Sequence, residues 1–128
     1  MKHYTSIDQS ENLLELGVSP ETADFVYYKY NRAKSYHLGL MQPAMYQHGL
    51  MEGHIPCWSV GALIDIMPQT IEDKNGVGFG LNVSHGYVEY YNPSMGALYS
   101  KHHSTSSETT LDACFEMVCY LIEKGFAK

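Results

Sequence analysis

The chain has 128 residues, 45% of them hydrophobic, a length and composition that suit one globular domain and exclude a disordered chain. Its net charge is −6 and Arg32 is its only arginine, which argues against nucleic-acid binding because such proteins carry a basic, arginine-rich face. It shows no apolar segment of signal-peptide or membrane-span length and has only three cysteines, so we expect a reduced, cytoplasmic protein that contacts no membrane.

The first predicted element is a helix over residues 7–16. Ser6 suits the N-cap position, and Gln9, three residues later, completes a capping-box pattern with it. Gly17 follows the last apolar residue and provides the left-handed conformation that ends many helices. These signals define both ends of the helix.

The next segment changes from helical to strand character. Ser19 and Pro20 predict a second, short helical turn, because serine caps helices and proline suits the first helical position. The aromatic residues that follow favour a strand over 25–30. Residues 31–54 show neither the helical nor the strand periodicity of apolar residues. They predict a long functional loop or, as the alternative, a short helix over 43–50.

A second full helix is predicted over 60–67. Ser59 can cap it, and Pro68 marks its end. Its apolar residues recur at the spacing of one buried helical face. These residues are Val60, Leu63, Ile64 and Met67.

Strand signals dominate the following segment. Asn75 and Gly76 form the strongest short hairpin dipeptide, because both residue types accept a positive φ. Apolar and polar residues alternate on either side of this turn and of a second one near Gly86. The pattern predicts an antiparallel meander over 70–91, and 97–102 can add one more strand.

The final helix, predicted over 108–124, has the clearest apolar face. At 100° per residue, its large apolar side chains fall within one arc, with Tyr120 opposite. The arc contains Leu111, Cys114, Phe115, Val118, Leu121 and Ile122. The solvent side carries the acids Asp112, Glu116 and Glu123. The sequence therefore predicts an α+β fold, with a small antiparallel sheet packed against helices.

No set of residues predicts a catalytic, metal or cofactor site. The seven histidines are scattered and lack the paired spacing of zinc ligands. Cys57 and Ser59 stand at a helix start and could form a nucleophile site, but a buried thiol and a helix cap explain them better. The acids of the final helix could form a carboxylate pair, but a solvated helix face explains them better.

Eleven tyrosines are the only functional signal on which we build a hypothesis. Tyrosine is favoured at interfaces because it combines a large contact area with a polar tip, although it is also common in strands. The candidate binding residues are Tyr27, Tyr28, Tyr30, Arg32, Trp58, Tyr87 and Tyr90. The leading hypothesis is a non-enzymatic interaction protein that binds a protein partner or itself, as a homodimer. The alternative is a small-molecule-binding protein or minor enzyme with a pocket near 25–58.

Three stretches of the chain carry a resemblance to other proteins. They are residues 14–24, LELGVSPETAD, residues 55–68, IPCWSVGALIDIMP, and residues 111–121, LDACFEMVCYL. Together they resemble short, uncharacterised proteins of gut Bacteroidales genomes, often found near prophage or mobile elements. The resemblance implies a shared order of elements and no catalytic residue. Residues 25–54 differ from that group, so a function located there would be particular to this chain.

Overall fold

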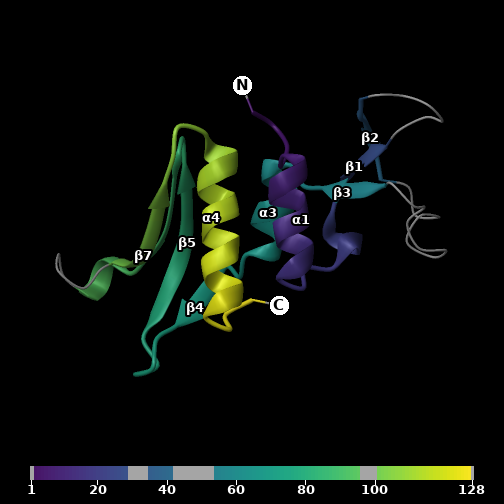
Figure 1. Ribbon diagram of the computed structural model, residues 1–128. Coiled ribbons are helices and arrows are strands. Elements are labelled where there is room, and N and C mark those ends of the chain that lie inside the picture. Colours follow the sequence, from purple (N-terminus) through teal and green to yellow (C-terminus); the bar gives the residue numbers. More distant parts are fainter. Residues whose placement is uncertain (1, 29–34, 42–53, 96–100, 128) are drawn as a thin grey trace.

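The computed structural model describes residues 2–28, 35–41, 54–95 and 101–127. In these ranges two antiparallel sheets and three α-helices form an α+β fold, which confirms the predicted class. Figure 1 shows helix α4 (Thr110–Glu123) lying between the larger sheet on one side and helices α1 (Ile7–Glu15) and α3 (Val60–Ile66) on the other. The smaller sheet lies beyond these two helices.

The helix ends follow the local signals in the sequence. Ser6 and Gln9 form a complete capping box, and Ser59 caps α3 by accepting a hydrogen bond from the backbone of Ala62. Gly17 has a φ of +94° and ends α1 as predicted. The short turn after it is the 3-10 helix η1 (Pro20–Thr22).

The larger sheet is a meander of four antiparallel strands in sequence order. These are β4 (Thr70–Glu72), β5 (Gly78–Ser84), β6 (Tyr87–Tyr91) and β7 (Lys101–Ser106). The predicted meander over 70–91 is confirmed, and the 3-10 helix η2 (Pro93–Met95) follows it. Of the strand predicted over 97–102, residues 101–102 begin β7, and 97–100 lie outside the described residues. The polar run Ser104–Ser106 joins the sheet through pairing with β6 rather than through an apolar pattern of its own.

The turn between β4 and β5 is closed by one aspartate. The backbone amide of Asp73 donates to the carbonyl of Val77 at 2.9 Å. Its carboxylate Oδ1 accepts from the backbone amides of Asn75 and Val77 at 2.8 and 2.9 Å. Gly76 has a φ of +79°, as the dipeptide predicts. The turn is therefore held by its own hydrogen bonds in a fixed position beside the C-terminal end of α4.

Helix α4 is buried on more of its circumference than its sequence predicts. Its buried side chains are Leu111, Ala113, Cys114, Met117, Val118 and Leu121. Phe115 and Ile122, placed within the apolar arc, are half-buried and pack against the core. Helix α4 contacts both the sheet and α3, so two separate sides of the helix are covered.

The smaller sheet has the strand order β2-β1-β3, and its members are β1 (Phe25–Tyr28), β2 (His37–Leu40) and β3 (Ile55–Cys57). The strand predicted over 25–30 is confirmed for its first four residues, and 29–30 lie outside the described residues. The prediction of a loop throughout 31–54 is wrong for 37–40. The alternative helix over 43–50 also lies outside the described residues.

Lys2 ties the start of the chain to α4. Its Nζ donates to Asp112 Oδ1 at 2.8 Å, and Gln9 Nε2 donates to the same oxygen at 2.8 Å. Burial raises the pKa of the Asp112 carboxyl, but these hydrogen bonds outweigh burial and leave that pKa below its ordinary value. The ionised carboxylate therefore stabilises the folded state.

We expect Asp112→Asn to lower the free energy of unfolding by about 0.5–1 kcal/mol at neutral pH, because the pair is partly exposed. The folded pKa lies below the unfolded value of about 3.9, so this contribution is complete above about pH 4 and is lost as the pH falls through the folded pKa. Urea unfolding near pH 7 and near pH 3 measures it. The exposed Glu11→Gln is the control, and a deficit of Asp112→Asn that persists at acidic pH would contradict the assignment.

Candidate functional site

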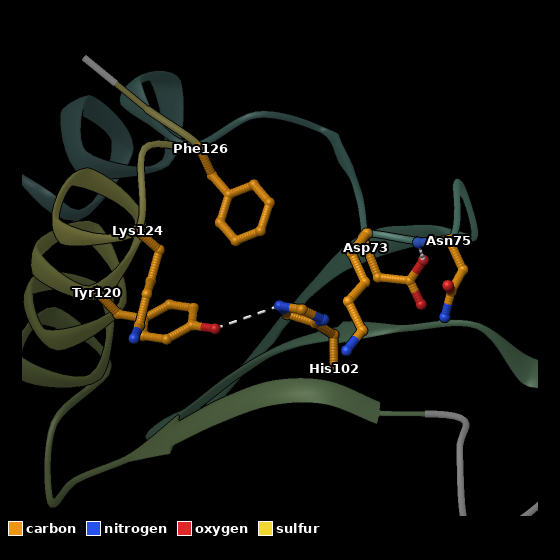
Figure 2. A pocket seen from close by; sticks show the side chains of 7 residues that line it. Asp73, Asn75, His102, Tyr120, Lys124 and Phe126 are labelled. Carbon is orange, nitrogen blue, oxygen red and sulfur yellow. Dashed lines mark hydrogen bonds between the residues drawn. The ribbon is translucent and has the colours of Figure 1, made fainter.

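A pocket of about 400 Å³ opens at the C-terminal end of α4, between that helix, the β4–β5 turn and the start of β7 (Figure 2). Its lining residues are Asp73, Lys74, Asn75, His102, Tyr120, Lys124 and Phe126. Figure 2 shows Tyr120 reaching from α4 toward His102 on β7, with Phe126 above them and the turn residues opposite the helix. Three separate elements therefore contribute to one site.

Phe126 is positioned by the way α4 ends. The amide of Gly125 donates to the carbonyl of Ile122, and the amide of Phe126 donates to the carbonyl of Leu121 at 2.8 Å. With Gly125 at a φ of +80°, this is a Schellman motif, which reverses the chain after a helix. The reversal directs the phenyl ring back over the helix end, where it forms an apolar wall of the pocket.

His102 enters the pocket because β7 contains a bulge. Tyr90 pairs with His103 and Tyr91 pairs with Lys101, so His102 is an extra residue without a cross-strand partner. Consecutive side chains of a regular strand point to opposite faces, and a bulge interrupts this alternation. Both histidines consequently contact Tyr120 on the helix-facing side of the sheet.

The aromatic groups of the site form one contiguous cluster. The rings of His103 and Tyr120 are stacked, with centroids 3.6 Å apart and planes 6° apart. The Tyr120 hydroxyl and Nε2 of His102 share a hydrogen bond of 3.2 Å, and Phe126 meets the His102 ring edge-to-face with centroids 5.5 Å apart. Burial raises the pKa of Tyr120, so its phenol stays protonated near neutral pH. The pocket therefore has a rigid aromatic floor with polar edges.

Positive charge predominates among the lining residues. Lys74 and Lys124 provide two cations, and Asp73 is the one carboxylate of the lining. Oδ1 of that carboxylate already accepts two backbone amides of its own turn. In a chain with a net charge of −6, this local excess of positive groups is unusual and favours an anionic ligand.

His103 provides a pH-dependent property of the site. Burial lowers its pKa, and electrostatic interactions with His102 and Lys124 lower it further. A folded pKa below the unfolded value of about 6.5 means that the neutral ring stabilises the protein above that pH, and that stability is lost as the pH falls below it.

We therefore expect acidification from about pH 7.5 to about pH 5.5 to destabilise the wild type more than His103→Phe, which keeps an aromatic ring on Tyr120 without a titrating group. Urea unfolding midpoints at the two pH values provide the measurement. His85→Gln, an exposed histidine in the β5–β6 turn, is the matched control. An equal loss of stability in the wild type and His103→Phe would contradict the assignment to His103.

A second pocket, of about 330 Å³, lies at the opposite end of α4. Several of its polar groups already have structural roles. Lys2 binds Asp112, and the Thr110 hydroxyl accepts the backbone amide of Gly86 at 3.0 Å. The first pocket is the better candidate because its polar groups face one another across an aromatic floor.

No match to this chain is found among protein families, curated protein sequences or solved structures. The resemblance to the Bacteroidales proteins therefore stays a prediction, and the geometry of the site is what indicates a function. None of the helices in the described ranges has the length and apolar character needed to cross a bilayer. The same ranges contain no group of three or more histidine, cysteine or acidic side chains placed to hold a metal ion.

The structure describes five of the seven predicted binding residues, and these five do not form one site. Trp58 and Tyr90 are fully buried, and each is hydrogen-bonded inside the protein, so neither belongs to an exposed binding surface. Tyr27 and Tyr28 lie half-buried on β1, and Tyr87 lies half-buried on β6 in the other sheet. Tyr30 and Arg32 lie outside the described residues.

Cys57 and Ser59 have structural roles. Cys57 is fully buried, and burial together with the nearby Asp24 carboxylate raises the pKa of its thiol to about 12. Ser59 caps α3, and both its backbone amide and its hydroxyl donate to the carboxylate of Asp24. Cys57 therefore lacks the accessible thiolate that a nucleophile needs, and the Ser59 hydroxyl is engaged in capping α3.

Sequence reasoning missed the residues that do form the pocket. His102 and His103 were counted among scattered histidines, and Tyr120 was placed on the solvent side of its helix. Two local signals are present: consecutive histidines near the start of a polar strand, and the sequence Lys124-Gly125-Phe126 at a helix end. Neither signal shows that the two segments meet, because their contact depends on the bulge in β7.

Proposed function

We propose that this protein binds a small organic molecule in the pocket at the C-terminal end of α4. The observation that carries the proposal is the combination of apolar walls and convergent polar groups in one hollow. The rings of Tyr120 and Phe126 provide the walls, the two lysines provide hydrogen-bond donors, and His102 provides a polar ring edge. A ligand site of this kind joins an apolar surface to a few placed polar groups that fix the orientation of the ligand.

Binding is favoured over covalent catalysis by the composition of the lining. None of the seven described lining residues is a serine, threonine or cysteine, so the lining provides no aliphatic hydroxyl or thiol nucleophile. The Tyr120 hydroxyl is hydrogen-bonded to His102, and burial raises its pKa. The ionised, nucleophilic form of the phenol is therefore disfavoured. These groups are suited to recognise a ligand.

A thermal-shift screen tests the proposal, because a ligand that binds only the native state raises the melting temperature. The screen covers aromatic carboxylates, phosphate esters, nucleotides and uncharged aromatics. We expect stabilising compounds that lose their effect in Lys124→Gln and keep it in His85→Gln. A screen without stabilising compounds, or one whose compounds act equally on both variants, would overturn the proposal.

A second candidate function is self-association through the outer face of the larger sheet. Tyr87, Glu89 and Tyr91 alternate along β6 on the face opposite α4, and Tyr91 is 40% exposed. Asn82 Nδ2 and the Tyr87 hydroxyl both donate to Glu89, at 2.9 Å each, which holds the carboxylate beside the tyrosines. Tyrosine is enriched at protein interfaces, so we assign the homodimer hypothesis to this face.

Sedimentation velocity over a range of protein concentrations tests self-association. We expect the wild type to shift toward dimer as the concentration rises, and Tyr91→Ser to stay monomeric. Leu40→Ser is the control, because Leu40 is 63% exposed but lies in the smaller sheet. A wild type that stays monomeric at every concentration, or a Tyr91→Ser variant that still dimerises, would overturn this candidate.

A further inference from the structure

The bulge in β7 places two adjacent imidazoles at this end of α4, of which His102 lines the pocket and His103 is stacked on Tyr120. His102 and His103 both lie on the helix-facing side of the sheet, one hydrogen-bonded to the edge of Tyr120 and the other stacked on its face. In a regular strand one of the two would point to the opposite face of the sheet. The pair is therefore a product of the local backbone geometry.

Each element around this pair contributes identifiable groups. Helix α4 provides Tyr120 and the Lys124 ammonium, and the β4–β5 turn provides Lys74 and the Asp73 carboxylate. Strand β5 provides the apolar ring of Phe79, and β6 provides Tyr90, whose hydroxyl donates to the Pro68 carbonyl. The charges that act on His103 are those of His102 and Lys124, both of which oppose its protonation.

An anion in the pocket would offset the repulsion that opposes protonation of the imidazoles. Placed between Lys74 and Lys124, it would supply the negative charge that a protonated imidazole needs. A tetrahedral phosphate group suits the site better than a carboxylate. Its dianion matches the two lysines in charge, and its three terminal oxygens can accept donors from the turn, the strand and the helix at once.

We propose that the ligand is a phosphate monoester with an apolar body, and that its dianion binds together with a proton taken up by the His102–His103 pair. The inference depends on the proposed function and assigns its ligand class. The phosphate lies between the lysines and His102, and the apolar body of the ester lies against Phe126. The proton comes from solvent and is held on an imidazole ring, so that no covalent bond of the ester is broken.

Calorimetric titration of the full chain with phenyl phosphate tests the inference. The titration is run near pH 7.5, where a phosphate with a second pKa of about 6 is already a dianion, so protons taken up on binding must go to the protein. Repeating it in buffers of different ionisation enthalpy measures the number of protons. NMR shifts of the imidazole C–H groups then identify which ring receives the proton.

We expect phenyl phosphate to bind with net uptake of up to one proton, and inorganic phosphate and benzoate to bind more weakly. Lys124→Gln, an exposed position that does not endanger folding, is expected to weaken binding about tenfold or more. His102→Gln is expected to weaken binding similarly and to reduce proton uptake. His85→Gln, at the opposite end of α4, is expected to change neither quantity.

The remaining outcomes separate the inference from the proposed function. Binding of phenyl phosphate without proton uptake, or binding of uncharged aromatics in its place, would overturn the inference and leave a small-molecule site in this pocket. Equal affinities for phenyl phosphate and inorganic phosphate would overturn the assignment of an apolar body to the ligand. If none of these compounds binds and the broad screen also finds no ligand, both proposals are overturned.

Discussion

Trp58→Ala is expected to lower the free energy of unfolding by about 3–5 kcal/mol, the range for removing a large aromatic side chain from a core. The indole of Trp58 is fully buried, and its Nε1 donates to the hydroxyl of Thr22 at 2.9 Å. Its backbone exchanges hydrogen bonds with Thr5 at 2.9 and 3.0 Å. The truncation therefore leaves a cavity where α1, β3 and α3 converge. Domains of this size have a total stability of about 5–15 kcal/mol, so the loss is a large fraction of it.

Urea unfolding followed by far-ultraviolet circular dichroism measures this loss, since Trp58 is the only tryptophan and the variant has no indole fluorescence. Trp58→Phe is the matched control, because it keeps most of the apolar volume and removes the indole N–H. We expect it to lose much less stability and to bind the pocket ligand like the wild type. A Trp58→Phe variant that folds normally but loses ligand binding would show that Trp58 belongs to the functional site.

Gly86→Ala is expected to lower the free energy of unfolding by about 2–4 kcal/mol. This is the cost of holding alanine in a left-handed conformation plus the cost of weakening two hydrogen bonds. Gly86 has a φ of +68°, and a Cβ atom there would lie 2.6 Å from the backbone oxygen of Ser107. That backbone cannot easily move away, because Ser107 N–H donates to the Gly86 carbonyl and Gly86 N–H donates to Thr110. The substitution would therefore disturb the start of α4 as well as the β5–β6 turn.

Gly76→Ala is the matched control for this prediction. Gly76 has a similar φ of +79°, but a Cβ atom there meets nothing within 4 Å. Gly76→Ala is therefore expected to lower the free energy of unfolding only by the cost of the left-handed conformation, about 1–2 kcal/mol. Urea unfolding of the two variants measures the difference, and equal losses would show that the contact with Ser107 has no part in stability.

The helix ends of this fold are predictable from sequence because their causes are local. Ser6, Ser59, Gly17 and Gly125 each act within one helical turn, through a capping hydrogen bond or a left-handed residue. Neighbouring residues alone determine these interactions, so no knowledge of the tertiary structure is needed.

The short strands are less predictable because pairing, rather than composition, creates them. Strand β3 has three residues and contains Pro56, and β2 has four residues that include Gly39. Segments this short show no clear alternation, and both residue types are rare within strands. They become strands because β1 lies between them and supplies hydrogen bonds to both.

The candidate site could not be predicted because it depends on a register shift between two strands. Nothing in the residues near His102 specifies that it is the extra residue of a bulge. Tyr120 was expected opposite the apolar arc, which is correct for an isolated helix. In the fold β7 covers that side of α4 and half-buries the ring against His103.

The stack of His103 on Tyr120 also provides a spectroscopic label that needs no chemical modification. With the two rings parallel and 3.6 Å apart, each lies within the shielding cone of the other. The carbon-bound protons of the His103 imidazole are therefore displaced upfield from those of a solvent-exposed histidine. Any ligand that separates or tilts the rings changes this displacement directly, so one-dimensional proton NMR can report on events at the end of α4.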